Sequence, residues 1–286
     1  LMDVIVEHKH PFKNAALKDA THARSYDRMA DDKRAYDAWV RSPEGIASVQ
    51  AIAGVLGVRH RTVDLSGKTI CFGTPAYGGK FDMPYIKSMA YTGALLERQG
   101  LDFFTVFVPN DSLIHKARNS IVRAFLTETT ATHLLFVDAD MGWDPDAVVR
   151  LLSHDKEIVG AAGIRKEDPI SFCYRPHPER KICNETGCWQ VESIGTGFLL
   201  IARTAIEKMI AAYPELKYTD AKDVEFHALF YNELAHGKDW SEDYTFCRRW
   251  GALGGEIWMD PTIALDHVGG KTWSGSVARE SMIQRQ

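Results

Sequence analysis

The feature that most constrains the fold is a short apolar run that ends in two closely spaced aspartates. Leu134 to Val137 are consecutive apolar residues, which is typical of a strand buried on both faces of an α/β sheet. Asp138, Ala139 and Asp140 follow at once, where open α/β sheets bind ligands and where carboxylates are hard ligands for cations. Residues i and i+2 of an extended segment point the same way, so we expect both aspartates to face one cation or sugar nucleotide. The alternative is a solvated turn with a helix cap.

Composition places the chain among ordinary soluble globular proteins. Its 286 residues are 45% hydrophobic and 25% charged, enough for one large domain or a domain with an appendage. No segment approaches the roughly 18 consecutive apolar residues of a membrane span, and no secretory signal is evident. The net charge of −4 gives no global basic field for nucleic acid. Five cysteines, an odd number, favour a reducing compartment, and we expect a cytoplasmic protein.

Residues 1–66 differ from the remainder and predict a small helical appendage. Residues 14–40 are polar and helix-prone, and Ser42 with Pro43 is typical of a helix start. Apolar residues then recur at helical spacing over 46–56. The sequence therefore predicts two parts, a helical appendage over 1–66 and a second domain over 67–286.

From residue 69 onward, predicted strands and helices alternate. The strands are expected at 69–75, 102–108, 134–137 and 157–163, and the helices at 83–99, 112–127 and 145–152. This alternation is the signature of a mostly parallel, Rossmann-like α/β sheet with helices on both faces. Further strands are expected at 169–174 and 189–194, while residues 213–240 are expected to be irregular.

Two segments place suitable groups beside the predicted nucleotide cleft. The first strand ends in a Gly/Pro-rich loop that includes Thr74, Pro75 and Tyr77, and glycine there permits close backbone approach to a nucleotide. Arg118 lies on the helix that precedes the central strand, and a guanidinium suits a diphosphate through its fork of donors. For Lys116 and Arg123 on the same helix, a solvated helix face is the alternative.

Two later segments are candidates for the acceptor side. One is the run that precedes a buried strand, Gly195, Thr196 and Gly197, where glycine lets the backbone lie close to a bound sugar. The other begins at Trp240, where Ser241 is a candidate cap for a helix whose first turn holds Glu242 and Asp243. Capping alone accounts for both acids; the functional interpretation is a carboxylate that accepts a proton from an acceptor hydroxyl.

A histidine and a group of thiols are candidates for metal binding. His267 stands at the end of a predicted strand, and an imidazole that joins Asp138 and Asp140 suits Mn²⁺. A hydrogen-bonded structural histidine is the alternative. Cys173, His177, Cys183 and Cys188 have the right side chains for zinc, but their spacing matches no familiar motif, which favours a hairpin loop with reduced cysteines.

The ordered set of motifs resembles the GT-A glycosyltransferases. The set is a glycine-rich first loop, an arginine-bearing helix, Asp-Ala-Asp, Gly-Thr-Gly-Phe, Glu-Asp at a helix start and Asp-His-Val-Gly. It is most similar to the soluble family-2-like and Anp1-like members of bacteria and their phages. The resemblance covers residues 69 to about 270 and rests on order and spacing. It implies a GT-A-type domain over 67–286 in a bacterial or phage-infected cell.

The resemblance also implies roles for the candidate residues. Asp138, Asp140 and His267 would hold Mn²⁺ or Mg²⁺ against the diphosphate of a nucleotide-sugar donor, with UDP as the expected nucleotide. Asp243 would match the base of inverting members, with Glu242 beside it. Retaining members carry an acid in a similar place, so both stereochemical outcomes stay open. The implied function is transfer of a sugar to an acceptor hydroxyl.

The acceptor and two alternative functions remain open at this stage. The acceptor is a saccharide, a protein or a hydroxymethylated base of phage-type DNA. Modified DNA would require a basic flank, for which the candidates are Arg165, Lys166, Arg175, Arg180, Lys181, Arg248, Arg249 and Lys271. The alternatives are a nucleotidyltransferase-like enzyme, which also uses paired acids with a metal, and a non-catalytic nucleotide-sugar-binding module.

Overall fold

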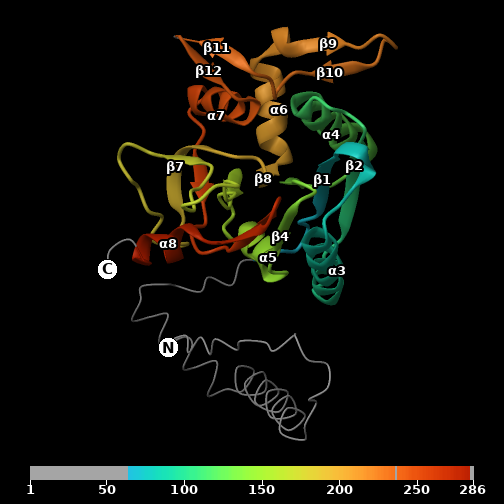
Figure 1. The fold of residues 1–286 in the computed structure, drawn as a ribbon. Coiled ribbons are helices and arrows are strands. Elements are labelled where there is room, and N and C mark those ends of the chain that lie inside the picture. Colours follow the sequence, from blue (N-terminus) through green and yellow to red (C-terminus); the bar gives the residue numbers. More distant parts are fainter. Residues whose placement is uncertain (1–63, 236, 284–286) are drawn as a thin grey trace, which may run out of the picture. The chain divides into compact units, whose positions relative to one another are not determined.

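Eight strands of the described chain form one twisted sheet with helices on both faces (Figure 1). The computed structural model describes residues 64–235 and 237–283, so the helices predicted within residues 1–63 lie outside the described part. The order across the sheet is β2-β1-β3-β8-β5-β13-β7-β6. The strand bounds are β1 Ile70–Ala76, β2 Phe103–Pro109, β3 His133–Val137, β5 Ile158–Gly160, β6 Tyr174–Pro176, β7 Trp189–Ile194, β8 Phe198–Ala202 and β13 Ile257–Met259.

The sheet is mostly parallel, as the alternation of elements predicts. Strand β1 pairs in parallel with β2 and β3, and β13 pairs in parallel with β5. Strand β8 is antiparallel to both β3 and β5, and β7 is antiparallel to both β13 and β6. Six strands of this sheet therefore share one direction, and β7 and β8 oppose them. The predicted α/β fold class is confirmed.

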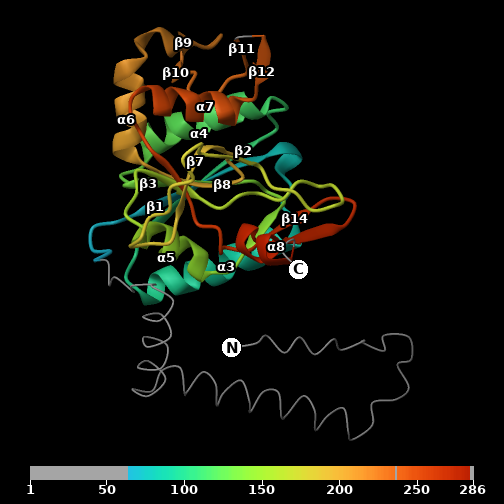
Figure 2. The same ribbon diagram turned by 90° about the vertical axis from the view of Figure 1, so that its left-hand side faces the viewer.

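Helices cover both faces of the sheet (Figures 1 and 2). On one face lie α3 Met83–Arg98 and α5 Asp146–Ser153, and on the other lie α4 Ile114–Glu128, α6 Arg203–Ala212 and α7 Glu242–Ala252. The helices predicted at 83–99, 112–127 and 145–152 are confirmed within two residues at each end.

The central strands have unbroken apolar sequences because both of their faces are buried. In β3, Leu134 and Phe136 pack into one core, while Leu135 and Val137 pack into the core on the opposite face. The same alternation holds in β8, where Leu199 packs into the first core and its neighbours Phe198 and Leu200 pack into the core on the opposite face. Each such side chain contributes roughly 1.5–3 kcal/mol on burial, so both faces stabilise the strand that carries the aspartates.

Smaller elements surround the sheet. A three-stranded antiparallel sheet is formed by β4 Met141–Trp143, β14 Leu265–Val268 and β15 Thr272–Gly275. Two hairpins are formed by β9 Lys217–Thr219 with β10 Glu225–His227, and by β11 Glu233–Ala235 with β12 Lys238–Trp240. The remaining elements are η1 Tyr77–Gly79, η2 Pro214–Leu216 and α8 Val277–Ile283. No helix in the part of the chain that the structure describes is long and apolar enough to span a membrane.

Two sequence predictions about these outer segments are wrong. Residues 213–240 are not irregular, because they contain both hairpins; their strands are short and largely exposed, and therefore lack an apolar alternation. A strand at 169–174 is not formed either, since β6 begins at Tyr174. Phe172 instead makes an isolated bridge to Ile164, which closes a small loop after β5.

Candidate active site

The Asp-Ala-Asp segment is a tight turn between β3 and β4. The N–H of Asp138 donates to the carbonyl of Gly197 (3.2 Å), and the N–H of Met141 donates to the carbonyl of Asp138 (3.1 Å). The prediction that this segment is extended is therefore wrong, because the turn begins as soon as β3 ends at Val137. As a result the two carboxylates have different partners within the same site.

Neighbouring backbone fixes this turn on two sides. The carbonyl of Ala139 accepts the N–H of Asp82 (3.0 Å), at the start of α3, and the carbonyl of Asp140 accepts the N–H of Val268 (2.9 Å), in β14. The turn is thus anchored to two other elements besides β3, and its carboxylates are held in place before any ligand arrives.

A cavity of about 410 Å³ opens at the carboxyl ends of β1 and β3. Its lining residues are Pro75, Tyr77, Lys80, Phe81, Asp82, Ile114, Asp138, Ala139 and Asp140. Five of the seven predicted donor-side residues therefore share one cavity. Lys80, Phe81, Asp82 and Ile114 were missed, although a cation and an aromatic ring directly after the first loop are a recognisable signal.

The other two predicted donor-side residues lie beneath the cavity rather than in its lining. Thr74 is fully buried, and its hydroxyl lies 2.8 Å from the Tyr85 hydroxyl in α3. Arg118 is also buried, at 4% exposure. Thr74 is therefore occupied with packing, whereas Arg118 acts through the acids that it contacts.

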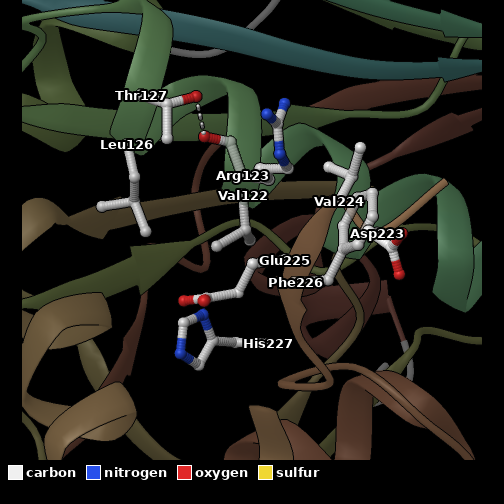
Figure 3. Close-up of a pocket in the computed structure, with 9 residues that line it drawn as sticks. All are labelled: Val122, Arg123, Leu126, Thr127, Asp223, Val224, Glu225, Phe226 and His227. Atoms are coloured by element: carbon white, nitrogen blue, oxygen red, sulfur yellow. Dashed lines mark hydrogen bonds between the residues drawn. The ribbon is translucent and has the colours of Figure 1, made fainter. Parts of the chain in front are cut away.

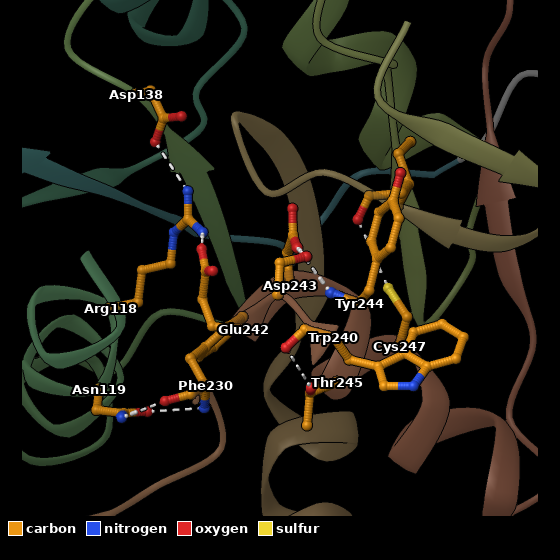
Figure 4. A network of polar contacts seen from close by, with 12 residues as sticks. Arg118, Asn119, Asp138, Phe230, Trp240, Glu242, Asp243, Tyr244, Thr245 and Cys247 are labelled. Carbon is orange, nitrogen blue, oxygen red and sulfur yellow. Dashed lines mark hydrogen bonds and ion pairs between the residues drawn. The ribbon is translucent and has the colours of Figure 1, made fainter. Parts of the chain in front are cut away.

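Arg118 bridges the central turn and the start of α7 (Figure 4). Its Nη2 lies 3.2 Å from Asp138 Oδ1, and its Nη1 donates to Glu242 Oε1. Burial raises the pKa of Glu242, and the Arg118 guanidinium opposes that shift only in part. Because Glu242 is paired inside the protein, it is a structural anchor for α7, and Asp243 is the more accessible acid of the two.

Asp243 lies in the first turn of α7, where local hydrogen bonds orient its side chain (Figure 4). Its Oδ1 accepts the N–H of Tyr244 (2.8 Å) and the hydroxyl of Ser241. The prediction that the Ser241 side chain caps α7 is therefore wrong, since it makes no hydrogen bond to the helix backbone and donates to Asp243 instead. That arrangement holds the Asp243 carboxylate in a half-buried position.

The predicted glycines lie directly behind these acids. A Cβ on Gly197 would lie 3.1 Å from Asp138 Oδ2, and a Cβ on Gly195 would lie 3.5 Å from Asp243 Oδ2. Thr196 between them is 1% exposed, and its hydroxyl has no hydrogen-bond partner among the described residues. The loop before β8 therefore brings backbone against Asp138 and Asp243 at once.

Asp140 and His267 form the other half of the site. Asp140 Oδ2 lies 3.4 Å from His267 Nε2 and 2.5 Å from Lys166 Nζ. Burial raises the pKa of Asp140, but the hydrogen bonds and charges of His267 and Lys166 outweigh it and lower that pKa to about 2. The carboxylate is therefore ionised at neutral pH and opens onto the cavity.

The orientation of His267 fits a metal ligand. Its Nδ1 donates to the carbonyl of Ile164, which leaves Nε2 facing Asp140. Carboxylate oxygen and imidazole nitrogen together suit a divalent transition ion. Within residues 64–235 and 237–283, however, no three His, Cys, Asp or Glu side chains are gathered closely enough to hold a metal, because Asp138 faces Arg118.

The cysteines considered as zinc ligands lie in two separate parts of the structure. Cys173 lies against Gly195 at the candidate site, whereas Cys183 and Cys188 face each other across a hairpin, where the Cys183 N–H donates to the Cys188 carbonyl (2.8 Å). All five cysteines are free.

A second cavity, of about 420 Å³, lies between α4 and the β9–β10 hairpin (Figure 3). Its lining residues are Val122, Arg123, Leu126, Thr127, Asp223, Val224, Glu225, Phe226 and His227. It contains none of the residues predicted for the site.

Comparisons with known proteins find similarity at the level of the fold. No protein-family model matches the chain, and no curated protein matches it. Among solved structures, protein A197 from STIV is 16% identical, with a TM-score of 0.46, over 74% of this chain and 91% of that one. A glycosyltransferase involved in glycosylation of the major capsid of PBCV-1 is 15% identical, with a TM-score of 0.27, over 51% and 66%.

A third similar structure is the inositol-1-phosphate CTP transferase from T. maritima, which is 12% identical, with a TM-score of 0.33, over 68% of this chain and 88% of that one. Since one fold hosts many activities, the function of this chain must be argued from its own side chains.

Proposed function

We propose that this chain is a glycosyltransferase that moves a sugar from a nucleoside-diphosphate donor to an acceptor hydroxyl. The observation that carries the proposal is the cavity at the carboxyl ends of β1 and β3, with Asp138 and Asp140 in its wall. Ligands of open α/β sheets bind at this edge. An exposed aromatic ring, Tyr77, suits the base of a nucleotide, and the ammonium group of Lys80 suits its diphosphate.

The residues of this site suit a divalent cation. Asp140 and His267 are adjacent, and Asp138 lines the same cavity as Asp140. Asp140 and His267 would hold Mn²⁺ or Mg²⁺, and Asp138 would join them as a third ligand only on turning away from Arg118. When bound, the ion supplies Lewis-acid neutralisation of the charge on the departing nucleoside diphosphate.

Asp243 is the residue that we assign to the acceptor hydroxyl. Ser241 and the Tyr244 N–H fix its Oδ1, and its Oδ2 lies toward Gly195. A carboxylate in that position accepts the proton of the attacking hydroxyl. Glu242 does not compete for this role, because its carboxylate is paired with Arg118.

The test is a screen of nucleotide sugars with and without Mn²⁺, by thermal shift and by analysis of the released nucleotide. We expect stabilisation by one donor, UDP-sugars first, and slow release of intact nucleoside diphosphate. Asp243→Asn should retain donor binding and lose transfer about 100-fold or more. Release of a nucleoside monophosphate or pyrophosphate would instead indicate nucleotidyltransfer, and binding without turnover would indicate a non-catalytic module.

A further inference from the structure

The basic side chains around the candidate site differ in whether they have carboxylate partners. Of the eight candidates named from the sequence, five are paired: Lys166 with Asp140, Lys181 with Glu179, Lys271 with Asp168, and Arg248 and Arg249 with Glu233. Arg165, Arg175 and Arg180 form no ion pair with any carboxylate of the described chain. Their charges remain available to a ligand, and two of these three arginines, Arg165 and Arg175, act on Tyr244, the residue after Asp243.

Arg175 is held in place by two aromatic rings. It lies in the edge strand β6 and is exposed, and its guanidinium carbon lies 4.9 Å from the Trp240 ring centre and 5.4 Å from that of Tyr244. A guanidinium packed on aromatic rings keeps its in-plane N–H donors free for a bidentate anion. Since Tyr244 directly follows Asp243, these donors lie at the acceptor side.

Arg165 approaches the same place from the loop after β5. Its N–H donates to the carbonyl of Ser171 (2.8 Å), two residues before Cys173, and a Cβ on Gly195 would lie 3.1 Å from Cys173 Cβ and 3.5 Å from Asp243 Oδ2. Burial raises the pKa of Tyr244, while the positive charges of Arg165 and Arg175 both oppose that shift. The charges of both arginines therefore act on the Tyr244 side chain, which directly follows Asp243, the acid assigned to the acceptor hydroxyl.

We propose that Arg165 and Arg175 bind a phosphate group of the acceptor, and that the acceptor of this enzyme is a phosphorylated molecule. The proposal rests on the proposed function, since it assigns Asp243 to the acceptor hydroxyl. The Asp243 carboxylate repels an anion, so the phosphate lies on the arginine side while the hydroxyl faces Asp243. Phosphate monoesters and phosphodiesters share this chemistry, and the test distinguishes them.

The test measures binding to the full chain by calorimetry at fixed ionic strength. The probes are D-glucose 6-phosphate for a monoester, a ten-nucleotide oligothymidylate for a phosphodiester and D-glucose as the uncharged comparison. We expect one phosphate-bearing probe to bind at least about tenfold more tightly than D-glucose, with that difference lost in the Arg165→Gln/Arg175→Gln double variant. Which probe binds identifies the source of the phosphate.

Arg180→Gln is the matched control. Arg180 also has no carboxylate partner among the described residues, and its guanidinium contacts neither the Trp240 ring nor the Tyr244 ring. Equal binding of all probes, or an equal loss in Arg180→Gln, would overturn the phosphate site. UDP binding is measured in parallel and should be unchanged in the double variant. Absence of UDP binding in the wild type would count against the donor site of the proposed function and leave the phosphate comparison interpretable.

Discussion

Asp260 shows how a single buried carboxylate ties stability to pH. It is 4% exposed and accepts hydrogen bonds from Arg150 (2.7 Å), His154 (2.9 Å) and the Thr262 N–H (2.9 Å). Burial raises its pKa, but these partners outweigh burial and hold the pKa well below its usual range. The folded chain therefore keeps this group ionised at pH values where the unfolded chain, with a pKa of about 3.9, takes up a proton.

We expect Asp260→Asn to lower the free energy of unfolding by about 3 kcal/mol at pH 7, because it leaves Arg150 and His154 without their charged partner. The stabilisation by Asp260 is complete above pH of about 4 and is lost as the pH falls toward the folded-state pKa. The difference between variant and wild type should therefore shrink below about pH 4. Urea unfolding at pH 7, 5 and 3 measures it, and a difference that is constant over this range would contradict the assignment.

Lys166 competes with any cation for Asp140. Its ammonium lies 2.5 Å from Asp140 Oδ2, on the same oxygen that faces His267. We expect Lys166→Ala to bind Mn²⁺ several-fold more tightly, because a positive charge next to the ligand has been removed. Lys271→Ala is the control, since that lysine pairs with Asp168. Mn²⁺ titration followed by electron paramagnetic resonance measures the affinity; equal or weaker binding in Lys166→Ala would refute the competition.

At the scale of elements, one buried ion pair joins α4 to α7, in addition to the core that both helices cover. Arg118 and Glu242 have side chains that are 5% and 11% exposed, and they are 124 residues apart in the chain. We expect Arg118→Met to destabilise the fold by about 3 kcal/mol, because it leaves the buried Glu242 carboxylate without its partner, and Glu242→Gln to cost less, because Arg118 keeps its ion pair with Asp138. The double variant should cost clearly less than the sum, as measured by urea unfolding. Additive costs would mean that the two side chains act independently.

The sequence predicts elements better than it predicts the partners of their side chains. The apolar run of β3 predicts a buried strand, and Leu134 to Val137 are all buried. The position of the Glu242–Asp243 pair at a helix start was also predicted correctly. The pairing of Glu242 with Arg118 was not predicted, because Arg118 reaches Glu242 only after α4 and α7 pack on the same face.

The turn at Asp138 is a second feature that residue spacing alone did not predict. Spacing alone places Asp138 and Asp140 on one side of an extended segment, but the hydrogen bonds to Gly197 and within the turn redirect them. Those bonds come from β8, whose position beside β3 is a property of the whole sheet. The hairpins over residues 217–240 were missed for another reason: exposed strands of three residues leave no periodic signal.

At the scale of the molecule, one sheet separates two cores that share the same strands. Leu199 and its neighbour Leu200 lie in the middle strand β8 and pack into opposite cores. We expect Leu199→Ala and Leu200→Ala each to cost about 2–5 kcal/mol and to shift one common unfolding transition. Far-UV and near-UV circular dichroism should give coincident midpoints in both variants. Separate transitions would show that the two cores unfold independently.

The reversed direction of β8 has a consequence for how this architecture diversifies. Strand β5 ends, and β8 begins, at the edge that carries the cavity, where the Ala161 N–H donates to the Phe198 carbonyl (3.0 Å). The intervening segment, residues 161–197, leaves the sheet at this rim, adds β7 and β6 to its far side, and returns to the rim at β8. Within it, residues 177–188 join two neighbouring antiparallel strands at the edge of the sheet, so this connection can lengthen, shorten or be exchanged without re-threading any other strand.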